Sequence, residues 1–503
     1  MKSTKVSFSS SRAFALPPAA MTVTLIVYLA LNIAMAFLMA LLPVLGILGA
    51  ISINLVAWLF FKSRYAIPLY IVVAGPSVAL TFSSSGILSR LYIGNILFGL
   101  TVLIWLAQFV LPERKGYGKL LGRGQLAPMI ALNLVGLISI INSRLFPDPN
   151  VPYTYPHSNV SITVVNLSEM FLLLGLPLLV IMTRKMVRTL RDFQWVYGAF
   201  IFAGVLYALG TVFAPALGWY SKKVILGVRR VQVFGSTSSG LGTTLVLFAD
   251  LAFAQALYSE GRKRVYWGLL TFLFSVGVIL AFGREAWIEL FMTMLIIIVL
   301  RTKNLAALLF LLLPLGLLFI PGVSDFFDSS KVYGADRLKI WADAITIWQH
   351  SPVLGIGAGN YQFFDRIYGV DKAGLAHNQY LEMMAEMGVQ GLLCLLWILG
   401  IMGWQAIKSF REARTTMSKS LTLAFLGFYI CFIFGGFFTG IILPSAAAGG
   451  GTAGFIEASY RWIFFGIVLT IPNWEKEALQ IEQPLPQPQQ DVIASTKQEV
   501  GQT

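Results

Sequence analysis

One histidine stands where a long polar segment meets an apolar run. This residue, His377, is one of three histidines in the chain. An imidazole titrates near neutral pH, so it can accept the proton of an attacking alcohol. The alternative interpretation is that His377 caps a helix. Arginines occur in segments of the same kind, and a guanidinium group binds phosphate oxygens through a planar fork. Most of the cations in such segments fall in three places: the loop from Lys222 to Arg230, Arg284, and the loop from Lys331 to Lys372. Together these residues predict an anion site with a general base beside it.

Further residues near His377 could support such a site. The candidates for this supporting role are Asn378, Tyr380, Glu382, Gly357 and Gly359. The two glycines belong to an alternating run that starts at Gly355, and glycine permits tight turns and a close approach of backbone to a ligand. Glu382 and Glu386 are four residues apart, so they could equally form a polar stripe between packed helices.

These groups must be held by a membrane-embedded framework. The chain has 503 residues, of which 57% are hydrophobic and 12% are charged, and its mean hydropathy is +0.75. A soluble domain has roughly a quarter of its residues charged. The composition therefore predicts an all-α, polytopic integral membrane protein. The net charge of +14 would suggest a nucleic-acid partner in a soluble protein. In a membrane protein the cations reflect the side of the membrane that each loop faces, so we expect no nucleic-acid partner.

Apolar stretches of membrane-spanning length predict about fourteen transmembrane helices. The predicted spans begin near Ala20, Val44, Ile67, Leu91, Leu126, Val164, Gln194, Ser238, Val265, Glu285, Asn304, Tyr380, Leu421 and Gly454. We divide the chain into a cytoplasmic segment 1–19, a transmembrane domain 20–472 and a disordered cytoplasmic tail 473–503. The proline- and glutamine-rich stretch at 483–490 is typical of such a tail.

The lysines and arginines alternate between loops as the positive-inside rule requires if both termini are cytoplasmic. In that orientation the cations in these three places and His377 all face outward. Binding of these cations to lipid headgroups is the alternative explanation of their position.

The largest outward loop, residues 322–379, is long enough to be functional. Leu338, Trp341, Ile345 and Trp348 recur within it at helical spacing, so residues 337–350 are predicted to form an amphipathic helix at the bilayer surface. Arg337 begins this helix, where pairing with Asp336 or Glu382 is an alternative to substrate contact.

We expect no metal and no cofactor. The two cysteines, Cys394 and Cys431, lie in apolar runs without a metal-binding pattern, and neither is expected to form a disulfide. Asp325 and Asp328 are the nearest approach to an acidic pair in the large loop, where a solvated position explains them better.

Five stretches in the same order and on the same side resemble the O-antigen ligase and O-antigen polymerase superfamily over residues 227–393. They are Arg229-Arg230-Val-Gln-Val-Phe-Gly235-Ser-Thr, Phe282-Gly-Arg284-Glu-Ala-Trp287, Arg337-Leu-Lys-Ile-Trp341, Ser351-Pro-Val-Leu-Gly355-Ile-Gly357-Ala-Gly359-Asn360 and His377-Asn378-Gln-Tyr380-Leu381-Glu382.

The resemblance implies a metal-independent glycosyltransferase of the bacterial inner membrane, acting in lipopolysaccharide or other polysaccharide biosynthesis. Such an enzyme moves a glycan from a polyprenyl pyrophosphate carrier to an acceptor hydroxyl, such as that of lipid A core, at the periplasmic face. By this resemblance, Arg284 and one of Arg229 or Arg230 would hold the pyrophosphate, Arg337 would be a secondary ligand, and His377 would accept the proton. Polymerase activity and protein O-glycosylation remain alternatives, and transport of a small anion such as bicarbonate is an alternative of another class.

Overall fold

The computed structural model describes residues 62–77, 92–110, 122–155, 160–225, 228–234, 238–303, 337–370, 373–446 and 453–482, together with Ser236 and a few positions between 28 and 59. This part of the chain is built from helices joined by short links, with two antiparallel two-stranded hairpins. The predicted spans near Ala20 and Val44 lie almost wholly outside the described residues, and the span near Asn304 lies wholly outside them.

The described elements follow one another along the chain without a larger sheet. The helices are η1 (Ser63–Tyr65), α3 (Ala66–Ser77), α4 (Ile93–Val110), α5 (Arg123–Leu145), α6 (Ile162–Met186), α7 (Leu190–Leu217), α8 (Ser238–Tyr258), α9 (Gly261–Leu280), α10 (Arg284–Thr302), α14 (Arg337–Gln349), α15 (Tyr361–Tyr368), α16 (Gln379–Glu412), α17 (Thr416–Gly435) and α18 (Ala453–Glu482). Strands β1 (Thr154–Tyr155) and β2 (Val160–Ser161) form one hairpin, and β3 (Tyr220–Ile225) and β4 (Val228–Val231) form the other.

Among the described residues, 8 helices are long and apolar enough to cross a membrane. They are α5, α6, α7, α8, α9, α16, α17 and α18. The all-α class and the multi-pass membrane character are confirmed, while the number fourteen is not. The predicted spans near Ile67 and Glu285 correspond to α3, which has 12 residues, and to α10, which carries charged residues at both ends.

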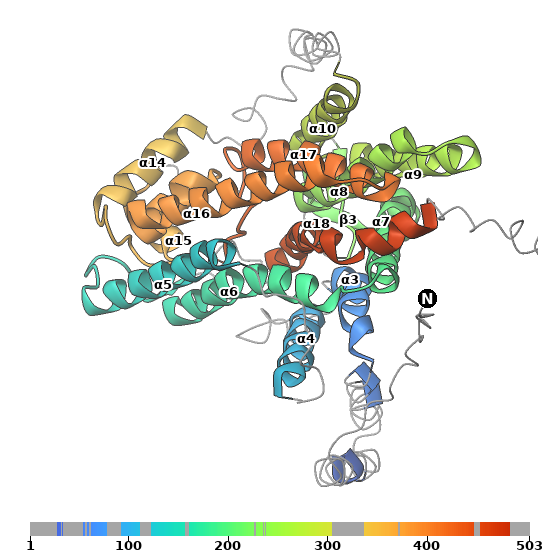
Figure 1. Ribbon diagram of the computed structural model, residues 1–503. Helices are drawn as coiled ribbons and strands as arrows, with labels where there is room; N and C mark the ends of the chain where they lie inside the picture. Colours follow the sequence, from blue (N-terminus) through green and yellow to red (C-terminus); the bar gives the residue numbers. More distant parts are fainter. Residues whose placement is uncertain are drawn as a thin grey trace, which may run out of the picture.

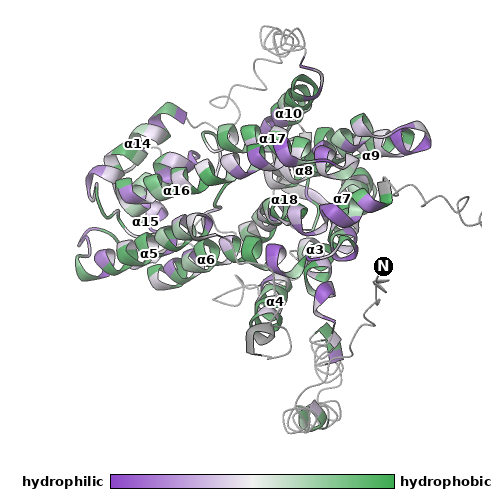
Figure 2. Ribbon diagram, viewed as in Figure 1, coloured by the Kyte–Doolittle hydropathy of each residue, from purple (hydrophilic) through white to green (hydrophobic). Residues whose placement is uncertain are grey.

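The helices differ in how much of their apolar surface the protein itself covers. The most apolar stretch of α18 is 89% buried, whereas those of α5 and α9 are 28% buried. Figure 1 shows α18 in the middle of the bundle and α9 at its edge. In Figure 2, hydrophobic residues follow the lengths of α5, α6 and α9, and hydrophilic residues gather near helix ends. The uncovered apolar faces of α5 and α9 therefore suit contact with lipid.

The segments that connect successive helices, here called links, gather at two opposite ends of the bundle. At one end, the last turns of α18 contact two other links: Asn473 donates to the carbonyl of Val187, and Glu475 accepts from the backbone of Arg414. At the other end, which we call the loop end, lie α14, α15 and the links that join α5 to α6 and α17 to α18. Figure 1 shows α14 and α15 packed at one end of α5, α6 and α16.

The structure differs from the prediction in one boundary and in one hairpin. Helix α18 continues through Pro472 to Glu482, so residues 473–482 are helical rather than part of a disordered tail, because Trp474 and Ala478 keep that stretch packed in the core. Residues 483–503 lie outside the described part of the chain. The hairpin β3–β4 was not predicted, since its short strands lie between two apolar runs.

Helix α14 confirms the amphipathic helix predicted in the large loop, with a difference in its packing. Its buried residues are Ile340, Asp343, Ala344 and Ile347. The predicted apolar stripe lies on another face, where Leu338 is 71% exposed and Ile345 is 42% exposed. The protein leaves Leu338 and Ile345 uncovered, as expected for a helix that touches the bilayer surface. The other two residues of the stripe, Trp341 and Trp348, are half-buried, and Trp348 packs against the core of the loop end.

Candidate active site

His377 lies at the loop end, directly before α16. Its φ angle of 48° is unusual for a residue other than glycine. The next residue, Asn378, caps α16, because its side-chain oxygen accepts from the backbone of Tyr380 at 3.0 Å and of Leu381 at 3.1 Å. Asn378 and not His377 is therefore the helix cap, which removes the alternative interpretation of the histidine.

The backbone on both sides of His377 is held by charged side chains. The carbonyl of His377 accepts a hydrogen bond from Arg337 at 3.4 Å, and the backbone of Ala376 donates to the carboxyl group of Glu382. Arg337 also donates to the carbonyl of Phe438 in the link between α17 and α18. These contacts hold the backbone at His377 in its strained conformation, which persists only where the surrounding structure fixes it.

Burial and the neighbouring charge of Arg337 lower the pKa of His377 from 6.5 to about 4. Burial acts first, because desolvation disfavours the charged imidazolium, and the guanidinium then repels it. The imidazole is consequently neutral near pH 7 and can accept a proton.

Three of the four predicted anion ligands converge on one carboxyl group. Glu285, at the start of α10, interacts electrostatically with Arg337, Arg230 and Arg284, in that order of strength. These arginines come from α14, β4 and the first position of α10, so tertiary structure assembles the cluster. Since Arg337 also contacts the backbone of His377, the predicted base and the cationic cluster adjoin one another.

Strand geometry separates the remaining two candidates. Successive residues of a strand point to opposite faces, and Arg229 and Arg230 are neighbours on β4. Arg230 is half-buried and interacts with Glu285, whereas Arg229 is exposed. The structure thus favours Arg230 as the member of the pair that belongs to the cluster.

Tyr380, a candidate for supporting the site, contacts the end of α17. Its hydroxyl donates to the carbonyl of Ile433 at 2.8 Å, and its ring packs on Phe437 at a centroid distance of 4.6 Å. The preceding residue, Gln379, binds the same link through its backbone, which donates to the carbonyl of Gly436 at 2.7 Å. Tyr380 therefore anchors the first turn of α16 against the end of α17.

The alternating glycines approach the protein's own backbone. Gly355, Gly357 and Gly359 all have positive φ angles, of 76°, 105° and 84°. The backbone of Gly357 donates to the carbonyl of Glu386 at 2.9 Å, and a Cβ on this glycine would lie 2.5 Å from the hydroxyl of Ser143. A Cβ on Gly359 would meet Val165 at 3.0 Å. The tight turns are confirmed, and the close approach that the structure shows is to α5, α6 and α16.

The glycine run docks at a break in α16. Gly388 has a φ of 68° and a ψ of −174° within that helix. Backbone groups released there pair with the loop: Ile356 donates to the carbonyl of Ala385 at 3.0 Å, and Val389 donates to that of Pro352 at 3.0 Å. Irregular backbone inside a membrane bundle needs such internal partners. The break thereby fixes the large loop above the first two turns of α16.

Replacement of Gly388 with alanine is expected to lower the free energy of unfolding by roughly 2 kcal/mol or more, because a side chain is strained at positive φ and its Cβ would lie 2.0 Å from the carbonyl oxygen of Val353. Thermal unfolding of the purified protein in detergent measures this. Gly400→Ala is the matched control on the same helix, since nothing lies within 4 Å of its Cβ position. Equal melting temperatures for the two variants would contradict the role of the break.

Three buried carboxyl groups bind the backbone of segments at the loop end. Of these three, only Glu382 was a candidate residue of the predicted site. Glu169 accepts from the backbone of Ala446 at 2.9 Å, and Glu386 accepts from that of Tyr361 at 3.1 Å. Glu382 and Glu386 are both buried on α16, and both accept hydrogen bonds from loop backbone. In the described part of the chain, no group of three histidine, cysteine, aspartate or glutamate side chains is arranged to hold a metal ion.

Charged residues within the spans join helices to one another. Arg461 on α18 is buried and donates to the hydroxyl of Thr243 on α8 and to the carbonyl of Ile441. Asp250 on α8 accepts from Thr293 on α10 at 2.7 Å. These contacts are structural links between α8, α10 and α18.

Sequence reasoning missed two parts of the site. Glu285 stands beside Arg284 and could have been noticed as its neighbour, but nothing local indicates that three arginines surround it. The link from Gly436 to Ala446 supplies backbone acceptors to Arg337 and a donor to Glu169. Backbone groups carry no signal in the side-chain pattern.

The bundle and its loop end define a class: a multi-pass membrane protein with a cationic cluster and a neutral histidine gathered at one end. Residues 269–396 match the family described as O-antigen ligase. The matched segment includes Arg284, Arg337 and His377, while Arg230 precedes it. The family acts in lipid-linked glycan transfer. No curated protein matches the chain.

Proposed function

We propose that this protein transfers a glycan from a polyprenyl pyrophosphate carrier to an acceptor hydroxyl at the periplasmic face of the bacterial inner membrane. The observation that carries the proposal is the convergence of Arg230, Arg284 and Arg337 beside His377. Three fixed cations with a neutral base adjoining them match a reaction that expels a pyrophosphate and removes a proton from an alcohol.

In this reaction the acceptor oxygen forms a bond to the anomeric carbon of the glycan, and the bond from that carbon to the carrier pyrophosphate breaks. The pyrophosphate leaves with the electron pair, and its growing charge is stabilised by the arginines. His377 takes the proton of the hydroxyl. Glu285 interacts electrostatically with all three arginines and offsets part of their charge when no donor is bound.

The donor itself would prepare the base. Burial is the larger cause of the lowered pKa of His377, and the charge of Arg337 lowers it further; a pyrophosphate bound to Arg337 offsets this second effect. The pKa then rises from about 4 towards its ordinary value, and the imidazole becomes a stronger base when the donor is in place.

A pH profile tests this environment. A base must be neutral to accept a proton, so kcat/KM is expected to fall as the pH falls through the pKa of His377 in the free protein, which is about 4. In Arg337→Gln the charge that repels the imidazolium is gone, so the pKa of His377 should rise. The decrease of kcat/KM on the acid side of the profile is then expected at higher pH. If kcat/KM of the wild-type protein already falls at pH 6.5 or above, the lowered pKa of His377 is contradicted.

The proposed activity is tested with purified protein in lipid vesicles that contain a polyprenyl-pyrophosphate glycan, with lipid A core, carrier-linked glycan repeats or a hydroxyl-bearing peptide as acceptor. Release of the carrier pyrophosphate with a glycosylated product establishes the transferase, and the productive acceptor separates ligase, polymerase and protein glycosylation. A chelator is included, and loss of turnover in its presence would contradict metal independence. Absence of turnover with every acceptor, together with passage of bicarbonate across the vesicles, would favour transport.

A further inference from the structure

A polar cavity opens at the loop end, beside α5 and away from Arg337. It has a volume of about 500 Å³ and lies between the end of α5, the link that follows it, the last turn of α14 and the glycine run. Cavities of this size bind small molecules through a few placed polar groups and an apolar wall. Its polar lining includes Asn142, Arg144, Asp148, Asn150 and His350.

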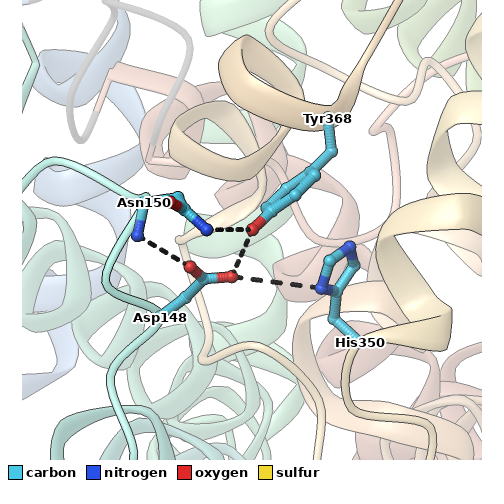
Figure 3. A network of polar contacts seen from close by, with 4 residues as sticks. All are labelled: Asp148, Asn150, His350 and Tyr368. Atoms are coloured by element: carbon cyan, nitrogen blue, oxygen red, sulfur yellow. Dashed lines mark hydrogen bonds and ion pairs between the residues drawn. The ribbon is translucent and has the colours of Figure 1, made fainter.

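A network of polar contacts fixes one wall of this cavity (Figure 3). The hydroxyl of Tyr368 donates to Asp148 Oδ2 at 2.6 Å, and the Nδ2 group of Asn150 donates to the same hydroxyl at 3.4 Å. Nδ1 of His350 lies 3.9 Å from Asp148 Oδ2. The backbone of Asn150 donates to Asp148 Oδ1 at 2.9 Å. Side chains from three separate segments are thus pre-oriented around one carboxylate, which retains lone pairs for a further donor.

The lining of the cavity also includes an aromatic and a cationic side chain. Tyr153 lines the cavity and is 55% exposed, so its ring face is accessible. Arg144 lies near that ring, with its guanidinium carbon 6.0 Å from the centroid. Hydrogen bonds from Arg144 to Thr163 at 3.0 Å and to Asn166 at 2.8 Å hold the guanidinium in place. Phe146, at the rim, is 77% exposed.

This combination fits a sugar ring better than an anion, a metal ion or an acyl chain. A pyranose offers neighbouring hydroxyl groups that donate to a carboxylate and accept from amide and guanidinium groups. Its C–H face packs on an aromatic ring. The carboxylate of Asp148 would repel a phosphate, one carboxylate is too few ligands for a hard metal ion, and the polar wall would not hold an acyl chain.

We propose that this cavity, lined by Arg144, Asp148, Asn150, Tyr153 and His350, binds a sugar unit of the glycan. The proposal rests on the glycan-transferring function and names a subsite for it. Helix α14 separates the cavity from the reacting groups, since Arg337 is its first residue and His350 follows its last. Thirteen residues at 1.5 Å each span about 20 Å. The bound sugar is therefore a distant unit of an oligosaccharide, and its binding selects the glycan without joining the reaction.

Direct binding is the first test. The probes are the free glycan released by mild acid from the polyprenyl pyrophosphate donor and the core oligosaccharide released from lipid A, each titrated calorimetrically against the full-length protein in detergent. One probe is expected to bind, and Tyr153→Ala and Asp148→Asn are each expected to weaken its binding at least tenfold. The probe that binds identifies the donor or the acceptor as the source. Tyr153 is an exposed rim residue, so its variant folds even if Asp148→Asn does not.

Matched controls separate this proposal from the proposed function. Thr346→Ala, on the exposed face of α14, should leave binding unchanged, and so should His377→Ala. In the transfer assay, the two cavity variants should raise KM for the substrate that carries the bound glycan and leave kcat unchanged. Binding without any transfer would support the cavity and refute the transferase. If transfer occurs but neither probe binds, or if neither cavity variant changes KM, the cavity does not bind a sugar unit of the glycan. The proposed transferase activity would stand.

Discussion

His377→Ala is expected to lower the rate of glycan transfer by roughly two to four orders of magnitude, the usual contribution of a positioned general base. The variant removes the one neutral imidazole that adjoins the arginine cluster, while Asn378 still caps α16 and Arg337 still has the backbone carbonyls of residues 377 and 438 as acceptors. The protein should insert and fold as before. Release of carrier pyrophosphate in lipid vesicles measures the rate.

The control for this variant is His157→Ala, because the sequence predicts that His157 is a solvated residue of another outward loop. It should transfer glycan at the wild-type rate. Wild-type turnover by His377→Ala would remove the histidine from the mechanism. Loss of the variant from the membrane fraction would instead show that His377 is needed for the fold.

Arg284→Lys is expected to slow transfer by roughly ten- to a hundredfold, which corresponds to the loss of a charge-assisted hydrogen bond. Lysine keeps the charge of Arg284, but its single ammonium group does not reproduce the bidentate fork on a pyrophosphate. Because Arg284 starts α10 beside Glu285, the lysine can still balance the carboxylate, so the fold should be retained. Binding of the polyprenyl pyrophosphate carrier and the rate of transfer are both measured.

Arg229→Lys provides the matched control for Arg284→Lys. The same chemical change is made on β4, at an exposed side chain that precedes the half-buried Arg230. Binding and transfer should stay at wild-type values. Equal losses in the two variants would place Arg229 in the site, and wild-type carrier binding by Arg284→Lys would contradict the role proposed for Arg284.

The uncovered apolar residues of α14 bear on how a lipid-linked donor reaches this site. Leu338 and Ile345 lie on the exposed side of a helix whose first residue, Arg337, contacts the backbone of His377. Under the proposed function, a helix resting on the bilayer surface would hold the cationic cluster close to the lipid headgroups, where the pyrophosphate of a lipid-linked donor lies. The carrier chain can then remain in the bilayer while its headgroup enters the site.

The sequence by itself determined the membrane class, the helix of the large loop and the residue types of the site, because apolar length, helical periodicity and fixed charge are local properties of a chain. His377 could be selected because it lies where a polar segment meets a predicted helix, whereas Arg284 and Arg337 were selected because their motifs resemble those of the O-antigen ligase and polymerase superfamily. Residues 269–396, which match the O-antigen ligase family, include all three positions.

Only the tertiary structure decided which groups meet. The choice of Arg230 over Arg229 depends on the pairing of β4, and the meeting of three arginines at Glu285 depends on packing between distant elements. The link around Phe438 joins the site through a backbone carbonyl, 101 residues from Arg337. The glycines serve a helix break at Gly388 that no side-chain pattern marks. Contacts of this kind form between segments far apart in the chain, and backbone groups that make them are the same in every residue, so the sequence carries no local sign of them.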